Sequence, residues 1–289
     1  MGDQSNGNSV RKDLPLEGSV STWSALWSII SSNQTSKECL FTRSRTRTIY
    51  EFWQRAYAKD LLNLIEKRTY NEFLELGAGR GTTSMYLNEA GYKQITLVDL
   101  SEEAKNLAYK NFKKFQLSYK DFVLADVRMT PFPDESFDCI YNIGLLEHFE
   151  KPEDVLREAF RLLRKKGLIF MPVFPDIWSL NSFLLRLIFN PLSYIKKLIL
   201  TEDPSNEFMI RTRLTRSTYE EICKKSGFRT VDCLYYNPFP KIVRDGWYEN
   251  FIVLNFYKLI YQLRNLRSQK LHFQTNSFFG SAYVLIAIK

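Results

Sequence analysis

The chain has 289 residues, 45% of them hydrophobic, and a formal net charge of +8 at pH 7. This composition suits one α/β core with extra elements. No basic run reaches the density of a nucleic-acid-binding arm, so we expect no nucleic acid partner. The four cysteines show no CxxC spacing and neither histidine lies near a cysteine pair. We therefore expect no metal site, and free thiols in a reducing, cytoplasmic setting.

The first 40 residues are interpreted as an N-terminal extension, partly disordered. Residues 1–16 are polar and lack the apolar stretch of a signal peptide, so we expect no secretory signal. Residues 41–175 are expected to form the core domain. It opens with a predicted helix over residues 50–67.

A glycine-rich turn follows the first predicted strand, residues 73–76. Glycine tolerates positive φ and lets a ligand approach the backbone. The helix predicted over residues 82–90 would point its free N–H groups at such a ligand. A dinucleotide fingerprint would need a third glycine where this chain has Thr82. The turn alone could also be no more than a tight turn, so the segments that follow decide between these readings.

Two further strands are predicted over residues 94–101 and 121–125. Asp99 lies about 20 residues beyond Gly77, the spacing at which an acidic residue meets the hydroxyl groups of a ribose. One carboxylate can accept hydrogen bonds from both hydroxyls. Asp126 follows the third strand, where it either contacts a ligand or forms a turn.

A fourth strand is predicted over residues 137–141, with Asn142 at its end and the sequence Leu-Leu-Glu-His-Phe at positions 145–149. A helix over residues 152–163 and a strand over residues 167–171 come next. This alternation of strands and helices favours a mostly parallel sheet covered by helices on both faces.

Taken in order, these motifs resemble the class I S-adenosylmethionine-dependent methyltransferases, and in particular the methyltransferase type 11 family. The resemblance covers roughly residues 45–175. It implies a doubly wound, mostly parallel seven-stranded sheet of the Rossmann-like kind, with S-adenosylmethionine as the cofactor. It also implies cofactor contacts, with Leu100 and Val127 flanking the adenine: Glu75, Gly77, Gly79, Asp99, Leu100, Asp126, Val127 and Asn142.

Two insertions are predicted outside this core. Residues 176–215 are expected to form a helical cap, and residues 216–289 the rest of the sheet with a second helical insertion at about 245–270. Residues 178–200 and 247–263 each show one polar stripe on an otherwise apolar helix. Neither is an uninterrupted apolar run of ~18 residues, so we expect no membrane span. The apolar faces could pack on each other, line a pocket for an apolar substrate, or lie on a membrane surface.

The last two strands are predicted over residues 230–236 and 282–288, as an antiparallel pair at the sheet's edge. Between the insertions, Ser217 and Glu220 match a capping box at the start of a helix, and Gly227 matches its end.

Methyl transfer from a sulfonium is a displacement that mainly requires alignment in a dry site. A hydroxyl acceptor would also need a general base. His148 is the candidate for that base, with a packing or helix-capping role as its alternative. Quinone O-methyltransferases often carry Glu-x-x-Glu-His, but Gly144 replaces the first Glu here, so a metal at Glu147 and His148 is not expected.

We therefore expect an S-adenosylmethionine-dependent methyltransferase acting on a small or lipid-like acceptor, with a hydroxyl oxygen as the first choice of acceptor atom. Two alternatives stay open: an NAD(P)-dependent oxidoreductase on a similar sheet, and a protein that binds S-adenosylmethionine without catalysis. We expect a cytoplasmic location and leave open a peripheral contact with a membrane.

Overall fold

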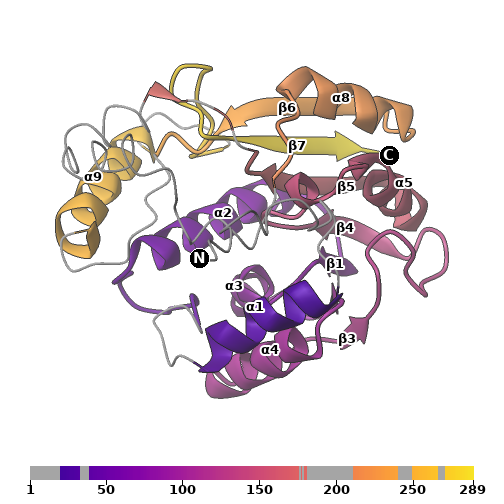
Figure 1. The fold of residues 1–289 in the computed structure, drawn as a ribbon, viewed down its shortest axis with the longest axis horizontal. Helices are drawn as coiled ribbons and strands as arrows, with labels where there is room; N and C mark the ends of the chain where they lie inside the picture. The colour runs from indigo at the N-terminus through magenta and orange to yellow at the C-terminus, as the bar shows by residue number, and fades with distance from the viewer. Residues whose placement is uncertain are drawn as a thin grey trace, which may run out of the picture.

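The computed structural model describes residues 20–32, 39–175, 177, 179–180, 211–239, 249–265 and 271–289. Within them, a seven-stranded sheet in the order β3-β2-β1-β4-β5-β7-β6 is covered by helices on both faces (Figure 1). The helix expected over residues 178–200 and most of the predicted cap lie outside the described residues.

Except for α1, which was not predicted, the elements of the first half of the chain follow the predicted order. They are α1 (Val20–Ser32), α2 (Ile49–Ile65), β1 (Phe73–Leu76), α3 (Thr82–Glu89), β2 (Ile95–Asp99), α4 (Glu102–Lys114), β3 (Asp121–Leu124) and β4 (Phe137–Tyr141). The second half gives η1 (Leu146–His148), α5 (Pro152–Leu162), β5 (Leu163–Val173), α8 (Arg216–Lys225), β6 (Thr230–Tyr236), η3 (Glu249–Val253), α9 (Leu254–Asn265) and β7 (Ala282–Ile288).

Strand β1 lies inside the parallel part of the sheet, where it pairs with both β2 and β4. All residues of β1 and β2 are buried, as expected for parallel strands covered on both faces. Strand β7 runs antiparallel to β5 and to β6, with Ile288 opposite both Leu168 and Thr230. The predicted fold class and the predicted pair of final strands are confirmed.

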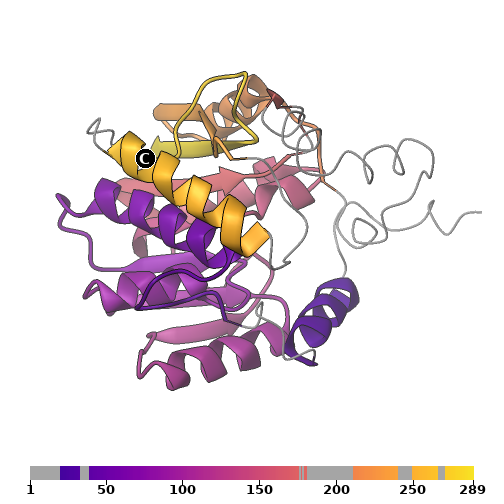
Figure 2. The same cartoon turned by 90° about the vertical axis from the view of Figure 1, so that its left-hand side faces the viewer.

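Alternate residues of the strands face two separate apolar clusters, because side chains along a strand alternate between the faces of a sheet. Phe73 of β1 packs with the cluster formed by α2, α3, α4 and α9. Its neighbour Leu74 packs with the cluster formed by α5 and α8. This double burial fixes the sheet between two helical layers, with α9 lying beside α2 (Figures 1 and 2).

The buried carboxylate of Asp60 ties α2 to the C-terminal segment. It accepts hydrogen bonds from the backbone N–H of His272 at 2.7 Å, from that of Phe273 at 3.1 Å and from the hydroxyl of Tyr236 at 2.7 Å. The imidazole Nδ1 of His272 lies 2.8 Å from the same carboxylate. One acidic residue in the middle of α2 thus holds together segments about 200 residues apart.

Two local predictions need correction. Helix α8 is capped by Thr215, whose hydroxyl accepts from the backbone N–H of Thr218 at 3.2 Å, and not by the predicted Ser217. Ser217 lies inside the first turn, with its hydroxyl 2.9 Å from that of Thr215. Strand β5 begins four residues before the predicted position, and Lys166 within it takes a positive φ of 65°. A bulge in the pairing with β4 accommodates that residue.

Candidate active site

The glycine-rich turn after β1 requires glycine at three positions. Gly77, Gly79 and Gly81 have φ values of +62°, +52° and +68°, a region that other residues rarely adopt. At Gly77 a Cβ would also lie 2.7 Å from Cδ1 of Leu145. Gly81 offers no side-chain cap to α3, which begins at the carboxyl end of β1, and the backbone N–H of Ser84, the third residue of that helix, donates to Glu75.

Asp99, at the end of β2, holds this turn in place. Its carboxylate accepts from the backbone N–H of Gly79 at 2.8 Å and from that of Ser101 at 3.0 Å. Burial raises the pKa of Asp99, and these backbone hydrogen bonds oppose the shift. A carboxylate offers about four acceptor positions, so the predicted ribose contact remains compatible with this arrangement.

Glu75 lies beneath the turn and is engaged by α3. Its carboxylate accepts from the backbone N–H of Ser84 at 3.3 Å and from the Ser84 hydroxyl. That hydroxyl lies 2.7 Å from the hydroxyl of Tyr141 on β4. Burial raises the pKa of Glu75 to about 8, so the carboxyl group is mostly protonated at neutral pH. Its direct contact with a cofactor stays a prediction.

The predicted adenine side of the site follows β3. The Asp126 carboxylate accepts from the backbone N–H of Arg128 at 2.9 Å and pairs with its guanidinium at 2.7 Å. Hydrogen bonding to Arg128 lowers the pKa of Asp126, which is therefore ionised. Val127 is buried and Leu100 is half-buried, so both offer apolar surface near the end of the sheet.

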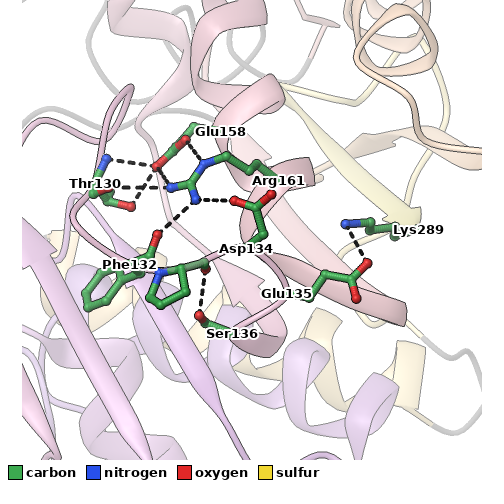
Figure 3. Close-up of polar contacts among 9 residues, drawn as sticks. Thr130, Phe132, Asp134, Glu135, Ser136, Glu158, Arg161 and Lys289 are labelled. Atoms are coloured by element: carbon green, nitrogen blue, oxygen red, sulfur yellow. Dashed lines mark hydrogen bonds and ion pairs between the residues drawn. The ribbon is translucent and has the colours of Figure 1, made fainter.

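The loop that continues from Asp126 is clamped by one arginine of α5 (Figure 3). Arg161 donates to Glu158, to Asp134 at 2.6 Å and to the carbonyl of Phe132 at 2.9 Å. Glu158 in turn accepts from the backbone N–H and the hydroxyl of Thr130 at 2.8 and 2.7 Å. This network fixes the connection between β3 and β4, and with it the course of the chain beside the site.

Several buried polar atoms of residues that follow β1 and β4 in the chain have no hydrogen-bond partner among the described residues. Asn142, at the end of β4, is fully buried, and neither its amide oxygen nor its amide nitrogen has a partner among the described residues. The same holds for Oε2 of Glu147 and for the hydroxyl of Thr82. An unsatisfied buried group costs roughly 1–3 kcal/mol, so such atoms indicate a place for a polar ligand.

His148 ends the short helix η1, and its side chain is buried. Its Nε2 lies 3.9 Å from Oε1 of Glu147, too far for a hydrogen bond but close enough for a charge interaction. The ring of Trp23 meets the imidazole edge-on, with the ring centroids 5.2 Å apart. The structure thus brings the predicted base together with Glu147, whose burial the sequence did not reveal.

Helix α1, which was not predicted, lies beside α4 (Figures 1 and 2), and two of its tryptophans contact residues of this site. Trp23 contacts His148, and the ring of Trp27 lies directly against Gly79. The guanidinium of Arg80 lies over the Trp27 ring at 5.2 Å. The available signal was the spacing of four residues between the tryptophans, which places both on one side of a helix.

Within the described part of the chain, no group of three or more His, Cys, Asp or Glu side chains could hold a metal ion. No helix there has the length and apolarity to cross a membrane. The four cysteines are free thiols, as predicted.

The arrangement fits S-adenosylmethionine as the sequence motifs implied. The glycine turn lets a ligand approach its backbone, and Asp99 stands at the end of β2. Side-chain groups of Asn142 and Thr82, which have no hydrogen-bond partner among the described residues, are available for polar atoms of a ligand. These residues would hold the cofactor where its methyl group can face the loop after β4.

Comparison with known proteins supports this fit. Residues 74–171 match the family described as the methyltransferase domain of type 11. A ubiquinone/menaquinone biosynthesis C-methyltransferase of Roseobacter denitrificans is 28% identical over 132 residues, which cover 45% of this chain and 51% of the relative. A protein of the same description from Escherichia fergusonii is 28% identical over 175 residues, which cover 57% of this chain and 68% of the relative. The chain thus spans about half to two thirds of the length of these curated relatives.

Solved structures share the fold at low identity. A protein of Pyrococcus horikoshii is 16% identical with a TM-score of 0.51, covering 89% of this chain and 97% of that one. A Haemonchus contortus phosphoethanolamine N-methyltransferase, solved with S-adenosylhomocysteine, is 16% identical with a TM-score of 0.50. The match covers 81% of this chain and 52% of that one. A [4+2]-cyclase, 14% identical over 86% of this chain and 84% of its own, has the same TM-score of 0.50, so the fold alone does not decide the chemistry. On the sequence match, residues 74–171 form a methyltransferase domain of the type 11 family, and the seven-stranded sheet around them has the fold of these solved structures.

Proposed function

We propose that the protein transfers a methyl group from S-adenosylmethionine to a small, lipid-like acceptor bound beside the loop after β4. The observation that carries this proposal is that buried polar atoms of Thr82, at the start of α3, and of Asn142 and Glu147, after β4, have no hydrogen-bond partner among the described residues. The sulfonium of the cofactor supplies an electrophilic methyl group, whose bond to sulfur breaks as the bond to the acceptor forms. The chain has to bind and orient the two reactants and to exclude water from the site.

The acceptor atom is proposed to be a ring carbon of a quinol-like compound, in preference to the hydroxyl oxygen expected from the sequence. Support comes from the names of the relatives, which are C-methyltransferases of quinone biosynthesis. Removing a phenolic proton makes an aromatic ring more nucleophilic at carbon as well as at oxygen. A base is therefore useful on either route.

His148 is proposed to take that proton, with Glu147 stabilising the charge that the imidazole acquires. The separation of 3.9 Å between the two side chains supports the pairing. Both side chains are buried, which strengthens an interaction between charges. Neither the oxidoreductase nor the non-catalytic alternative is favoured, since Thr82 stands where a dinucleotide fingerprint needs glycine and the relatives are enzymes.

Mass spectrometry of reaction mixtures tests this proposal. The protein is incubated with S-adenosylmethionine and either a short-chain naphthoquinol or a simple phenol. We expect S-adenosylhomocysteine and a C-methylated quinol. A product methylated on oxygen would overturn the choice of acceptor atom, and binding of the cofactor without turnover of either compound would count against this acceptor class.

A peripheral membrane contact, which the sequence left open, is also proposed, through the exposed side of η3 and α9. Large apolar side chains at the spacing of one helical stripe are exposed there: Ile252, Phe256, Leu259 and Leu263, each between 42% and 53%. Residues 250–270 contain four Lys and Arg and no Asp or Glu. Arg45 adds a further cation, because its guanidinium lies 3.3 Å from Asn255 of α9. Apolar side chains flanked by cations suit an anionic lipid surface.

Sedimentation with vesicles tests the contact. We expect binding to vesicles that contain phosphatidylglycerol and much weaker binding to pure phosphatidylcholine. Phe256→Asp should abolish the binding, whereas Tyr109→Asp, at a comparably exposed aromatic residue on α4, should not. Equal binding of both variants, or none by the unmodified protein, would contradict the proposed surface.

A further inference from the structure

We propose that α1 forms a wall of the cofactor site and that Trp27 is a cofactor-binding residue. The inference rests on the proposed function, because it assigns a role toward the same cofactor. It concerns a helix outside the segment that matches the methyltransferase family, residues 74–171. The proposal is carried by three contacts of α1 with the elements that build the site.

The first contact places Trp27 on the glycine turn. A Cβ at position 79 would lie 2.5 Å from Cη2 of Trp27 and still closer to the neighbouring ring atom. Real Cβ atoms do not approach other atoms so closely, so the ring occupies the space that any side chain at position 79 would need. Gly79 thus has two reasons to be glycine: its φ of +52° and the indole against it.

The second contact holds the ring in that place. The guanidinium of Arg80 lies over the Trp27 ring at 5.2 Å, a cation–π distance. Burial lowers the pKa of Arg80, but a guanidinium remains charged at neutral pH. Because Gly79 and Arg80 are neighbours within the turn, Trp27 contacts the segment that a bound cofactor would approach.

The third contact fixes the other parts of α1. Ser24 donates a hydrogen bond to Glu103 in the first turn of α4, and this lowers the pKa of that carboxyl group. Trp23 meets His148 edge-on at 5.2 Å. Helix α1 therefore reaches from α4 across the glycine turn to the candidate base, and Figures 1 and 2 both show it beside α4.

A ligand at the turn must therefore meet Trp27. An indole next to a bound nucleoside excludes water and adds flat apolar surface to the site. We accordingly expect Trp27→Ala to weaken the binding of S-adenosylhomocysteine about tenfold, mainly through faster release. Trp27→Phe, which keeps an aromatic ring, should lose less affinity for S-adenosylhomocysteine than Trp27→Ala.

The test uses the full chain and S-adenosylhomocysteine, with affinity from calorimetry and release rate from stopped-flow tryptophan fluorescence. Leu26→Ala is the matched control, since Leu26 is a half-buried neighbour on the same helix. Circular dichroism establishes that each variant is folded. In the unmodified protein, binding should also change the indole emission, and this change should be smaller in Trp27→Phe.

The outcomes separate this inference from the proposed function. If the unmodified protein fails to bind S-adenosylhomocysteine, the proposed function fails with it. If the unmodified protein binds while Trp27→Ala binds equally well, the role of Trp27 alone is refuted. Tighter binding by Trp27→Ala would show that the indole obstructs the site, which also overturns the inference. An equal loss in Leu26→Ala would assign the effect to the helix and not to the indole.

Discussion

Glu75 should make the stability of the protein depend on pH in a way that one substitution removes. The pKa of this carboxyl group is raised from 4.5 to about 8 by burial. Between these values the folded chain holds the proton more tightly than the unfolded chain does. The contribution of Glu75 to stability is therefore fully present below the pKa that this group has in the unfolded chain, and it is lost as the pH rises through the pKa of the folded chain.

The magnitude follows from the width of this window. Within it, each pH unit changes the free energy of unfolding by up to about 1.4 kcal/mol, and the slope flattens near the folded pKa. Between pH 6 and pH 8 the ionisation of Glu75 alone should lower the free energy of unfolding by about 2 kcal/mol. Glu75→Gln keeps an oxygen that can accept from the N–H and hydroxyl of Ser84 but cannot ionise.

Urea unfolding of both proteins from pH 5 to pH 9 measures the effect. Other titrating groups contribute equally to both, so the difference between the two curves isolates Glu75. We expect the variant to gain about 2 kcal/mol relative to the unmodified protein between pH 6 and pH 8. Curves that stay parallel over this range would refute the reasoning that burial dominates at Glu75.

Three further predictions concern the turn, the base and the core. Gly79→Ala should weaken S-adenosylhomocysteine binding more than tenfold by calorimetry, whereas Gly91→Ala, equally left-handed but facing open space, should not. His148→Ala should bind the cofactor normally yet lose about 100-fold or more in turnover, measured as S-adenosylhomocysteine formed; full activity would exclude it as the base. Asp60→Ala should lower the free energy of unfolding, measured in urea, by roughly 3 kcal/mol, because several buried donors lose their acceptor. Asp232→Ala, at an exposed residue, should change the free energy of unfolding little.

The core of the fold was predictable because its signals are local. The glycine turn and the apolar run of Phe73–Leu76 are adjacent in the sequence, and a short apolar run of this kind is typical of a strand that is buried on both faces. The two final strands matched their predicted bounds, since β-branched and aromatic residues fill both. The start of α8 was misplaced by two residues because Thr215 and Ser217 are both good caps, and only the backbone decides between them.

The site was predictable only in part because its remaining contacts are not local. The sequence pointed to Asp99 by spacing, but not to the fact that its carboxylate is bound by the N–H of Gly79. Glu75 was expected at the cofactor, and the structure engages it with Ser84 of α3. Trp27 lies some 50 residues before the glycine that it covers, so no pattern within either segment could connect them.

The central claim is that the turn after β1 binds S-adenosylmethionine with the help of Asp99. Calorimetric titration of S-adenosylhomocysteine into the unmodified protein and into Asp99→Asn tests it most directly, with NADH as the competing ligand. We expect micromolar binding of S-adenosylhomocysteine, a loss of at least tenfold in the variant, and no binding of NADH. Binding of NADH with none of S-adenosylhomocysteine would contradict the claim, and equal affinity in both proteins would remove Asp99 from the site.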